Sequence, residues 1–267
     1  MNDRLPGADE LLERARNEDM TWAGLAELVL DKSQSDGEHQ PDLDRARRCG
    51  FGEVIFGSGK SASDIARIAK QLIESGQNEV LVTRIAPEHA AEVAPLFQHS
   101  RHDSLGRTLR LSSTSEPLSQ LASTAPPALP LRHVSVVTAG STDIAIAREA
   151  VETLHWMQIN VSLTTDVGVA GPYRLLTHLE HLRRSSAVVV IAGMEGALAS
   201  VVGGLLPCPI IAVPTSVGYG SNFEGITTLL SMMSSCAAGV TTVNIDAGFK
   251  GGYVAGLIAA QHAETSH

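Results

Sequence analysis

The chain has 267 residues, of which 43% are hydrophobic and 18% charged, a composition that excludes disordered and fibrous proteins. Its formal net charge of -9 argues against the basic face that a nucleic acid partner requires, so we expect no such partner. Residues 1–130 hold 34 charged side chains and residues 131–267 hold 15, which predicts that the second half is the more deeply buried.

The cysteine pattern and the N-terminus predict a cytoplasmic protein. Three cysteines without paired spacing cannot complete a disulfide framework, and the charged N-terminus lacks the apolar core of a secretory signal. The stretch of 27 residues from 187 to 213 imitates a membrane span, with Glu195 as its single charge. Its glycines and prolines divide it, so we expect a strand, a helix and a second strand there, and no membrane partner.

The first half predicts a peripheral segment followed by a small α/β module. Residues 1–50 contain two short amphipathic helices, over 10–16 and 22–29, that cannot form a core alone. In the module, residues 51–120, a strand over 54–56, a helix over 65–73 and a strand over 80–83 make a βαβ unit. A helix over 87–97 and a strand over 108–111 follow, and the proline-rich residues 121–130 predict a linker.

The second half, residues 131–263, has a regular alternation of apolar runs and helix-length segments. The runs lie at 134–137, 161–164, 187–191, 210–213 and 242–245. Continuous apolar strands with helices between them are typical of a parallel sheet covered on both faces, the doubly wound α/β class. Ligands of such proteins bind beyond the carboxyl ends of the strands.

Four of the five loops at those strand ends are rich in glycine, at 139–143, 166–171, 192–196 and 214–220. Glycine lets the backbone approach a ligand closely, and the following helix offers free N–H groups to a phosphate. Tight turns and helix caps use the same residue types, but four such loops together favour a nucleotide site. The loops contain the candidate ligand-binding residues Gly140, Ser141, Thr142, Asp143, Asp166, Gly168, Gly193, Met194, Ser216, Gly218 and Gly220.

Several side chains have both a functional and a structural interpretation. Glu195 stands at the start of a predicted helix, where an unpaired carboxylate is costly to bury, so it either pairs with a cation or performs proton chemistry. Asp143 caps the predicted helix over 144–154 or acts in catalysis, and Arg174 clamps an anion or is a solvated helix residue. On the residues alone, Cys236 is interpreted as a small buried hydrophobe, as are Cys49 and Cys208. The ten histidines show no metal-ligand spacing.

Five runs in the second half together carry a resemblance to a known family. They are TAGSTD, DVGVAGPYRLL, VVVIAGMEGALASVVGGL, PIIAVPTSVGYG and SCAAGVTTVNIDAGF, in this order. They resemble the carboxylases of nickel-pincer cofactor biosynthesis, the pyridinium-3,5-biscarboxylic acid mononucleotide synthases, and the run RRCGFGEVIFGSGKSASDIA resembles the N-terminal module of that family. The C-terminal portion is similar to class I aminoimidazole ribonucleotide carboxylases and mutases, which implies a flavodoxin-like fold and a homo-oligomer, an octamer.

The resemblance implies a substrate and a mechanism. The substrate is nicotinic acid adenine dinucleotide, which the family carboxylates with CO2 at C5 of the pyridinium while its phosphoanhydride is cleaved to release AMP. Cys236 then becomes the nucleophile, because thiolate addition at C4 gives a dihydropyridine whose C5 attacks CO2. Glu195, in the matching AGMEG motif, becomes the base that removes the C5 proton.

The resemblance also gives roles to the remaining residues. The loop from Gly140 to Asp143 holds phosphate or ribose, and Lys60 and Arg174 balance the negative charge of the substrate. Ala192, Met194 and Ala197 form an apolar pocket for CO2. No tightly bound cofactor is expected, but Mg²⁺ can assist at the anhydride, with Asp143 or Asp166 as its ligand.

The chain departs from the family pattern at two histidine positions. Tyr173 precedes Arg174 where the family usually has histidine, and Asp44 stands at the position of another one. Tyrosine exchanges protons less readily than histidine at neutral pH, so these changes allow for another pyridinium or nucleotide substrate. Two alternatives stay open, namely an aminoimidazole ribonucleotide carboxylase or mutase, which needs no cysteine, and a nucleotide-binding relative without catalysis.

Overall fold

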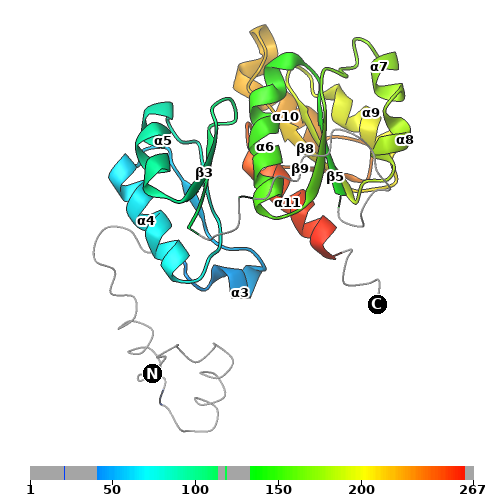
Figure 1. Ribbon diagram of the computed structural model, residues 1–267. Coiled ribbons are helices and arrows are strands. Elements are labelled where there is room, and N and C mark those ends of the chain that lie inside the picture. The colour runs from blue at the N-terminus through cyan, green and yellow to red at the C-terminus, as the bar shows by residue number, and fades with distance from the viewer. Residues whose placement is uncertain (1–20, 22–40, 114–117, 119–132, 262–267) are drawn as a thin grey trace. The chain divides into compact units, whose positions relative to one another are not determined.

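A computed structural model describes residues 41–113 and 133–261, together with residues 21 and 118. The chain divides into two compact units, residues 1–42 and 43–267, and every helix and strand described below lies in the second unit (Figure 1). The helices expected over 10–16 and 22–29 and the linker expected over 121–130 lie outside the described residues.

The first sheet of this unit has four strands in the order β1-β2-β4-β3. They are β1 (Val54–Phe56), β2 (Val80–Thr83), β3 (His99–Asp103) and β4 (Thr108–Ser112). Strands β1 and β2 are parallel, which confirms the expected βαβ unit, while β4 runs antiparallel to both of its neighbours. The sequence does not predict β3, because this edge strand is polar throughout and carries no apolar signal.

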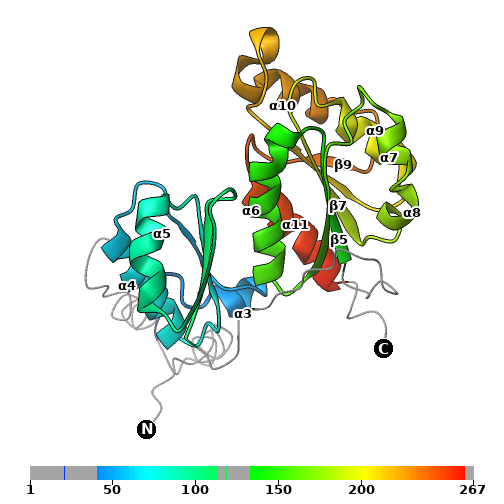
Figure 2. The same ribbon diagram turned by 45° about the horizontal axis from the view of Figure 1, so that its top comes forward.

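Two helices, α4 (Ala62–Glu74) and α5 (Pro87–Val93), cover one face of this sheet (Figure 2). The hydroxyl of Ser61 caps α4 by accepting the amide of Asp64 at 3.1 Å. The helix expected to run to residue 97 ends earlier, since Pro95 lacks an amide hydrogen and a 3-10 turn, η1 (Ala94–Leu96), takes over. A short helix, α3 (Arg45–Cys49), precedes β1.

The second sheet is parallel throughout and has the order β6-β5-β7-β8-β9. Its strands are β5 (His133–Thr138), β6 (Asn160–Thr164), β7 (Ala187–Ala192), β8 (Ile210–Pro214) and β9 (Val240–Thr242). This order is that of flavodoxin-like proteins and confirms the predicted fold class. The fifth strand, expected over 242–245, begins two residues earlier because Val240 pairs with Ile210.

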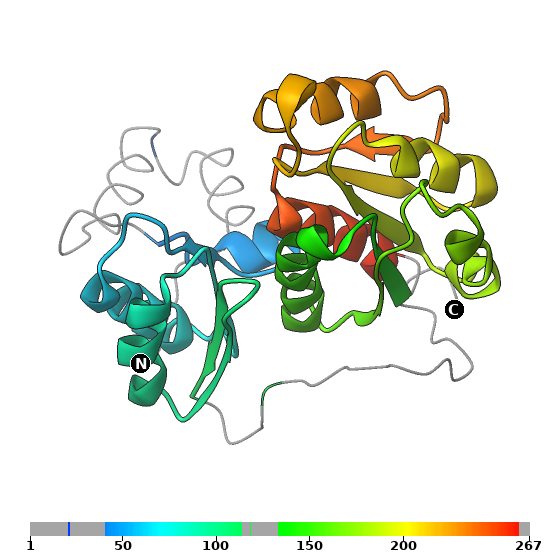
Figure 3. The same ribbon diagram turned by 90° about the horizontal axis from the view of Figure 1, so that it is seen from above.

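Helices cover both faces of the parallel sheet. One face carries α6 (Ile144–Trp156) and α11 (Gly248–Gln261), the green and red helices that lie side by side in Figure 3. The other carries α7 (Tyr173–Leu176), α8 (Leu179–Leu182), α9 (Ala197–Leu205) and α10 (Ile226–Met233), with the 3-10 turns η2 (Ser141–Asp143) and η3 (Gly220–Gly225) in the loops. Across the described residues, no helix has both the length and the apolar character that a membrane span needs.

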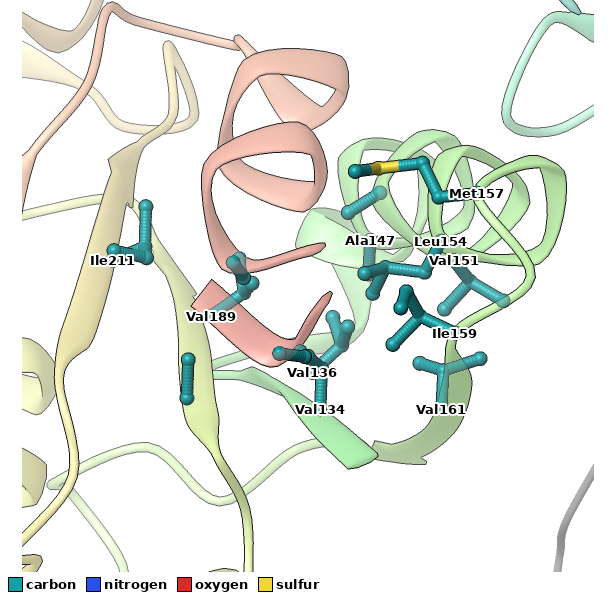
Figure 4. Packing of buried hydrophobic residues seen from close by; sticks show 14 of the residues in the cluster. Val134, Val136, Ala147, Val151, Leu154, Met157, Ile159, Val161, Val189 and Ile211 are labelled. Atoms are coloured by element: carbon teal, nitrogen blue, oxygen red, sulfur yellow. The ribbon is translucent and has the colours of Figure 1, made fainter. Parts of the chain in front are cut away.

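Alternate residues of each strand serve the two faces. Val189 points into the cluster under α6 and α11, together with Val134 and Leu154, as the close view in Figure 4 shows. Its neighbours Val188 and Val190 point to the opposite cluster. Burial on both faces explains why the strands are continuous apolar runs and why residues 187–213 imitate a membrane span.

Helix α6 also contacts the small sheet. Leu81 of β2 belongs to the same apolar cluster as α6, and the indole of Trp156 donates to the carbonyl of Glu79 at 2.9 Å. The fully buried Arg110 forms ion pairs with Glu79 and Glu152. Burial acts to raise the pKa of Glu152, but the nearby imidazole of His155 and the charges of Arg101 and Arg110 outweigh it and lower this pKa to about 2.

Candidate active site

The carboxyl ends of β5, β6, β7 and β8 surround a cavity of about 260 Å³. Three of the four predicted glycine loops supply most of its wall, and the fourth contributes Val217. The lining residues are Ala139, Gly140, Thr142, Asp143, Gly168, Val169, Ala170, Arg174, Ala192, Gly193, Met194, Glu195, Ala197, Leu198 and Val217. The cavity lies where doubly wound proteins bind their ligands, as the sequence predicts.

Asp143 holds the first loop together. Its side chain is 2% exposed, and its two carboxylate oxygens accept the amide of Gly140 at 2.9 Å and the hydroxyl of Thr215 at 2.8 Å. It stands at the N-cap position of α6 but makes no side-chain bond to that helix, so its carboxylate does not cap α6. Burial raises the pKa of Asp143, with the charge of Asp246 adding to this effect and the two hydrogen bonds opposing it.

Glycine is required at two points of the wall. A Cβ on Gly193 would lie 2.3 Å from the carbonyl oxygen of Val217, and a Cβ on Gly168 would lie 2.7 Å from that of Ala139. The loops therefore approach each other more closely than any side chain allows. All four residues of these two contacts line the cavity.

Glu195 lies in the turn between β7 and α9 and forms part of the cavity wall. Its side chain is exposed, so the cost of burying an unpaired carboxylate does not arise at this position. The preceding residue, Met194, has a left-handed backbone with φ of 54° and is hydrogen-bonded to Val217 through its amide at 2.9 Å. The turn thus holds a solvated carboxylate beside the apolar side chains of Ala192 and Ala197.

Arg174 lines the cavity and also a second, more open hollow of about 520 Å³. The second hollow is further lined by Thr165, Asp166, Val167, Tyr173, Thr177 and His178. The guanidinium of Arg174 forms an ion pair with Asp166, with Nη1 and Oδ2 2.6 Å apart. Both partners are about half exposed, so this guanidinium is open to a ligand from either side.

Other predicted ligand-binding residues lie outside the cavity wall. Lys60 follows β1 in the small module, and Ser141 is exposed beside the wall. Ser216, Gly218 and Gly220 belong to the fourth loop but are not among the lining residues. The amide of Ser216 instead donates to the carboxylate of Asp246 at 2.8 Å.

Sequence reasoning missed three residues that shape the fourth loop. Thr215 bonds to Asp143, Val217 lines the cavity, and Asp246 accepts the amide of Ser216. Asp246 follows β9 with a left-handed φ of 55°. An aspartate directly before an Ala-Gly pair at the end of the fifth apolar run is the signal that identifies this fifth strand-end loop.

Cys236 does not line the cavity of its own chain. The next residue, Ala237, lies beside the second turn of α9, because a Cβ on Gly203 would come within 2.9 Å of the Ala237 side chain. Gly203 is about 8 Å along α9 from Ala197 and Leu198, the α9 residues that line the cavity. Gly239 accepts the amide of Ile210, where β8 begins. This loop therefore lies toward the amino end of the sheet.

The interpretation of the cysteines as buried hydrophobes is wrong for two of the three. Cys236 and Cys49 are exposed, and Cys208 is partly buried, with burial raising the pKa of its thiol. Exposure leaves the Cys236 sulfur accessible to a reaction partner.

An exposed apolar row leads up to Cys236. Phe223, Ile226, Leu230 and Met233 recur at intervals of three and four residues along η3 and α10, and each is 46% to 70% exposed. This spacing places the three α10 side chains on one side of the helix. We call these four residues the α10 row.

The fold and the cavity define a doubly wound α/β protein with a cavity at the carboxyl edge of its parallel sheet. Residues 133–267 match the family model described as AIR carboxylase, and residues 34–113 match that of the LarB/PurE-like N-terminal domain. The chain therefore belongs to the AIR carboxylase family, a family of carboxylase- and mutase-type enzymes, and carries a LarB/PurE-like N-terminal domain.

Known proteins similar to this chain include a relative in sequence and a solved structure. An uncharacterized protein of Methanocaldococcus jannaschii is 34% identical over 225 residues, which cover 82% of each chain. The crystal structure of a PurE2 variant from Treponema denticola is 17% identical, with a TM-score of 0.40 over 50% of this chain and 87% of that one.

Proposed function

We propose that the chain carboxylates the pyridinium ring of nicotinic acid adenine dinucleotide at C5 and releases AMP. The product is pyridinium-3,5-biscarboxylic acid mononucleotide, a precursor of the nickel-pincer cofactor. The observation that carries this proposal is that Arg174 lines two hollows. A mononucleotide needs only one of these hollows. A dinucleotide whose diphosphate contacts Arg174 can place one of its two nucleotide halves in each hollow.

The first cavity suits the pyridinium half and CO2. Ala192, Met194 and Ala197 give it an apolar wall, which favours an uncharged and poorly hydrated molecule such as CO2. The thiolate of Cys236 adds to C4 of the ring, and C5 then attacks the carbon of CO2. Glu195 takes the proton from C5, and loss of the thiolate restores the aromatic ring. Water cleaves the anhydride to give AMP and the mononucleotide.

The mechanism requires Cys236 to come from a second copy of the chain. Its own cavity is at the carboxyl edge of the sheet, whereas Cys236 lies toward the amino end. The α10 row ends three residues before Cys236, and exposed apolar rows of this kind are typical of subunit interfaces. We therefore place Cys236 at an interface of a homo-oligomer, an octamer, in which it reaches the cavity of a neighbouring copy.

Of the two carboxylates considered as Mg²⁺ ligands, Asp166 is the better suited. Its side chain is 59% exposed beside Arg174, whereas both carboxylate oxygens of the buried Asp143 already accept hydrogen bonds. In the described part of the chain, no group of three or more acidic, histidine or cysteine side chains is arranged to hold a metal ion. Magnesium would thus arrive with the diphosphate, and Asp166 would add one carboxylate to its ligands.

Mass spectrometry of the reaction tests this function. The parent protein is incubated with nicotinic acid adenine dinucleotide, magnesium and ¹³C-labelled bicarbonate, next to the Cys236→Ala and Glu195→Gln variants. We expect labelled dicarboxylated mononucleotide and AMP from the parent only. Absence of both a product and a mass increase at Cys236 would refute the assignment.

Mixed oligomers test the role of the second copy. Cys236→Ala and Glu195→Gln chains are each inactive in this scheme, but co-assembled chains combine an intact Glu195 with an intact Cys236 from the neighbour. We expect product from the mixed oligomer alone. If the parent is active and the mixed oligomers of the two variants are inactive, both residues act from the same chain.

A second candidate function is that of an aminoimidazole ribonucleotide carboxylase or mutase. The match of residues 133–267 to the AIR carboxylase model favours it. This chemistry needs no thiol, so Cys236→Ser would retain activity on that ribonucleotide. Binding of either nucleotide without turnover would instead identify a relative that has lost catalysis.

A further inference from the structure

We propose that the small N-terminal module takes part in the active site through Arg84, a positioning residue for the fourth cavity loop. Arg84 follows β2 of the small sheet, and a chain of hydrogen bonds leads from it to Ser216, the residue before Val217 in the cavity wall. The effect on ligand binding rests on the proposed function, whereas the effect on the loop itself does not.

The first step joins Arg84 to α6. Its Nε donates to Oε1 of Glu149 at 2.8 Å, and its Nη2 lies 3.3 Å from Oε2. Glu149 is 3% exposed and Arg84 is 30% exposed, so the pair is largely removed from water. The backbone of Arg84 is left-handed, with φ of 54°. A buried carboxylate needs such a cation, and the two-pronged geometry fixes the guanidinium in one orientation.

The second step joins this pair to the segment before α11. Nη2 of Arg84 also donates to the carbonyl of Asp246, and Oε2 of Glu149 accepts the amide of Phe249 at 3.1 Å. Between these two residues, a Cβ on Gly248 would lie 2.3 Å from the carbonyl oxygen of Ile146. The segment from 246 to 249 is therefore held between α6 and Arg84.

The third step reaches the cavity. The amide of Asp246 donates to Pro214 at 2.8 Å, and its carboxylate accepts the amide of Ser216 at 2.8 Å. The residue after Ser216 is Val217, which lines the cavity and whose carbonyl accepts the amide of Met194. Because Asp246 contacts both sides of this turn, its position sets the position of Val217.

A second ion pair between the module and α6 provides a matched control. Arg101 and Glu152 lie 3.1 Å apart, with side chains 35% and 1% exposed, close to the values for Arg84 and Glu149. Arg101 donates to Glu152 and not to the segment from 246 to 249. Removal of Arg101 therefore loosens the contact between module and helix without releasing the cavity loop.

Hydrogen exchange read by mass spectrometry, without any ligand, tests the inference. In Arg84→Ala we expect amides of residues 215–217 and 246–249 to exchange about tenfold faster than in the parent. Arg84→Lys, which keeps the charge but loses one donating arm, should lie between the two. Arg101→Ala should leave these peptides unchanged. Unchanged exchange in Arg84→Ala, or equal acceleration in Arg101→Ala, would overturn the proposal.

A kinetic measurement then separates positioning from folding. With nicotinic acid adenine dinucleotide as substrate, we expect KM to rise about tenfold in Arg84→Ala while kcat changes less, because the wall is displaced and the reacting groups remain. Arg101→Ala should retain the parent KM. If the parent forms no product, the proposed function fails, but the exchange result still decides the role of Arg84. If Arg84→Ala does not fold, the hydrogen-exchange and kinetic measurements are made on Arg84→Lys.

Discussion

The burial of His133, at the start of β5, predicts that the protein loses stability under mildly acidic conditions. Its side chain is 2% exposed, and its ring centroid lies 5.2 Å from that of His181. Burial, with the nearby His181 adding to it, lowers the pKa of His133 from 6.5 to about 4. The unfolded chain binds a proton near pH 6.5 that the folded chain takes up only near pH 4, so acidification through this window favours unfolding.

The size of the effect follows from the two pKa values. Between pH 7 and pH 5, His133 should lower the free energy of unfolding by about 2 kcal/mol. Urea unfolding of the parent and of His133→Asn at both pH values measures this, since the variant lacks the titrating group. The parent should lose about 2 kcal/mol more than the variant. Equal losses in the two proteins would refute the argument from burial.

Three further predictions concern the cavity, the buried ion pairs and the second hollow. Gly193→Ala should weaken nucleotide binding in calorimetry by about tenfold or more, since its Cβ would collide with Val217, whereas Gly204→Ala, with open space around it, should not. Glu152→Ala should lower the urea-measured stability by about 3 kcal/mol by removing a carboxylate beside the buried Arg110; an unchanged midpoint would contradict this. Tyr173→Ala should weaken binding of the dinucleotide by about fivefold and leave binding of nicotinic acid mononucleotide unaffected, because the adenine base would stack on the Tyr173 ring. An equal loss for both ligands would show that no adenine base contacts Tyr173.

The parallel sheet could be predicted because its signal is local. The three central strands, β5, β7 and β8, are buried throughout and rich in apolar residues, and burial on both faces demands that composition. The glycine loops followed from the same reasoning, since they end those runs. Strand β3 was missed because an exposed edge tolerates polar side chains.

The site was predictable in its position but not in its details. Position along the chain shows that Glu195 follows a buried strand, but not that its turn leaves the carboxylate exposed. The distance between Cys236 and the cavity depends on how α10 runs along the sheet. The local sequence pattern does not predict this distance. The bond from Thr215 to Asp143 joins residues far apart in sequence, so only the folded chain shows it.

The buried carboxylates of α6 limit how this chain can be shortened. Glu149 and Glu152 each have their arginine partners on the small sheet or its neighbouring loops, and Trp156 donates to that sheet as well. A fragment that begins at residue 133 would lose these partners and expose Trp156 together with the apolar side chains of α6 that share a cluster with Leu81. An independent version of the parallel-sheet half therefore requires polar side chains along this side of α6.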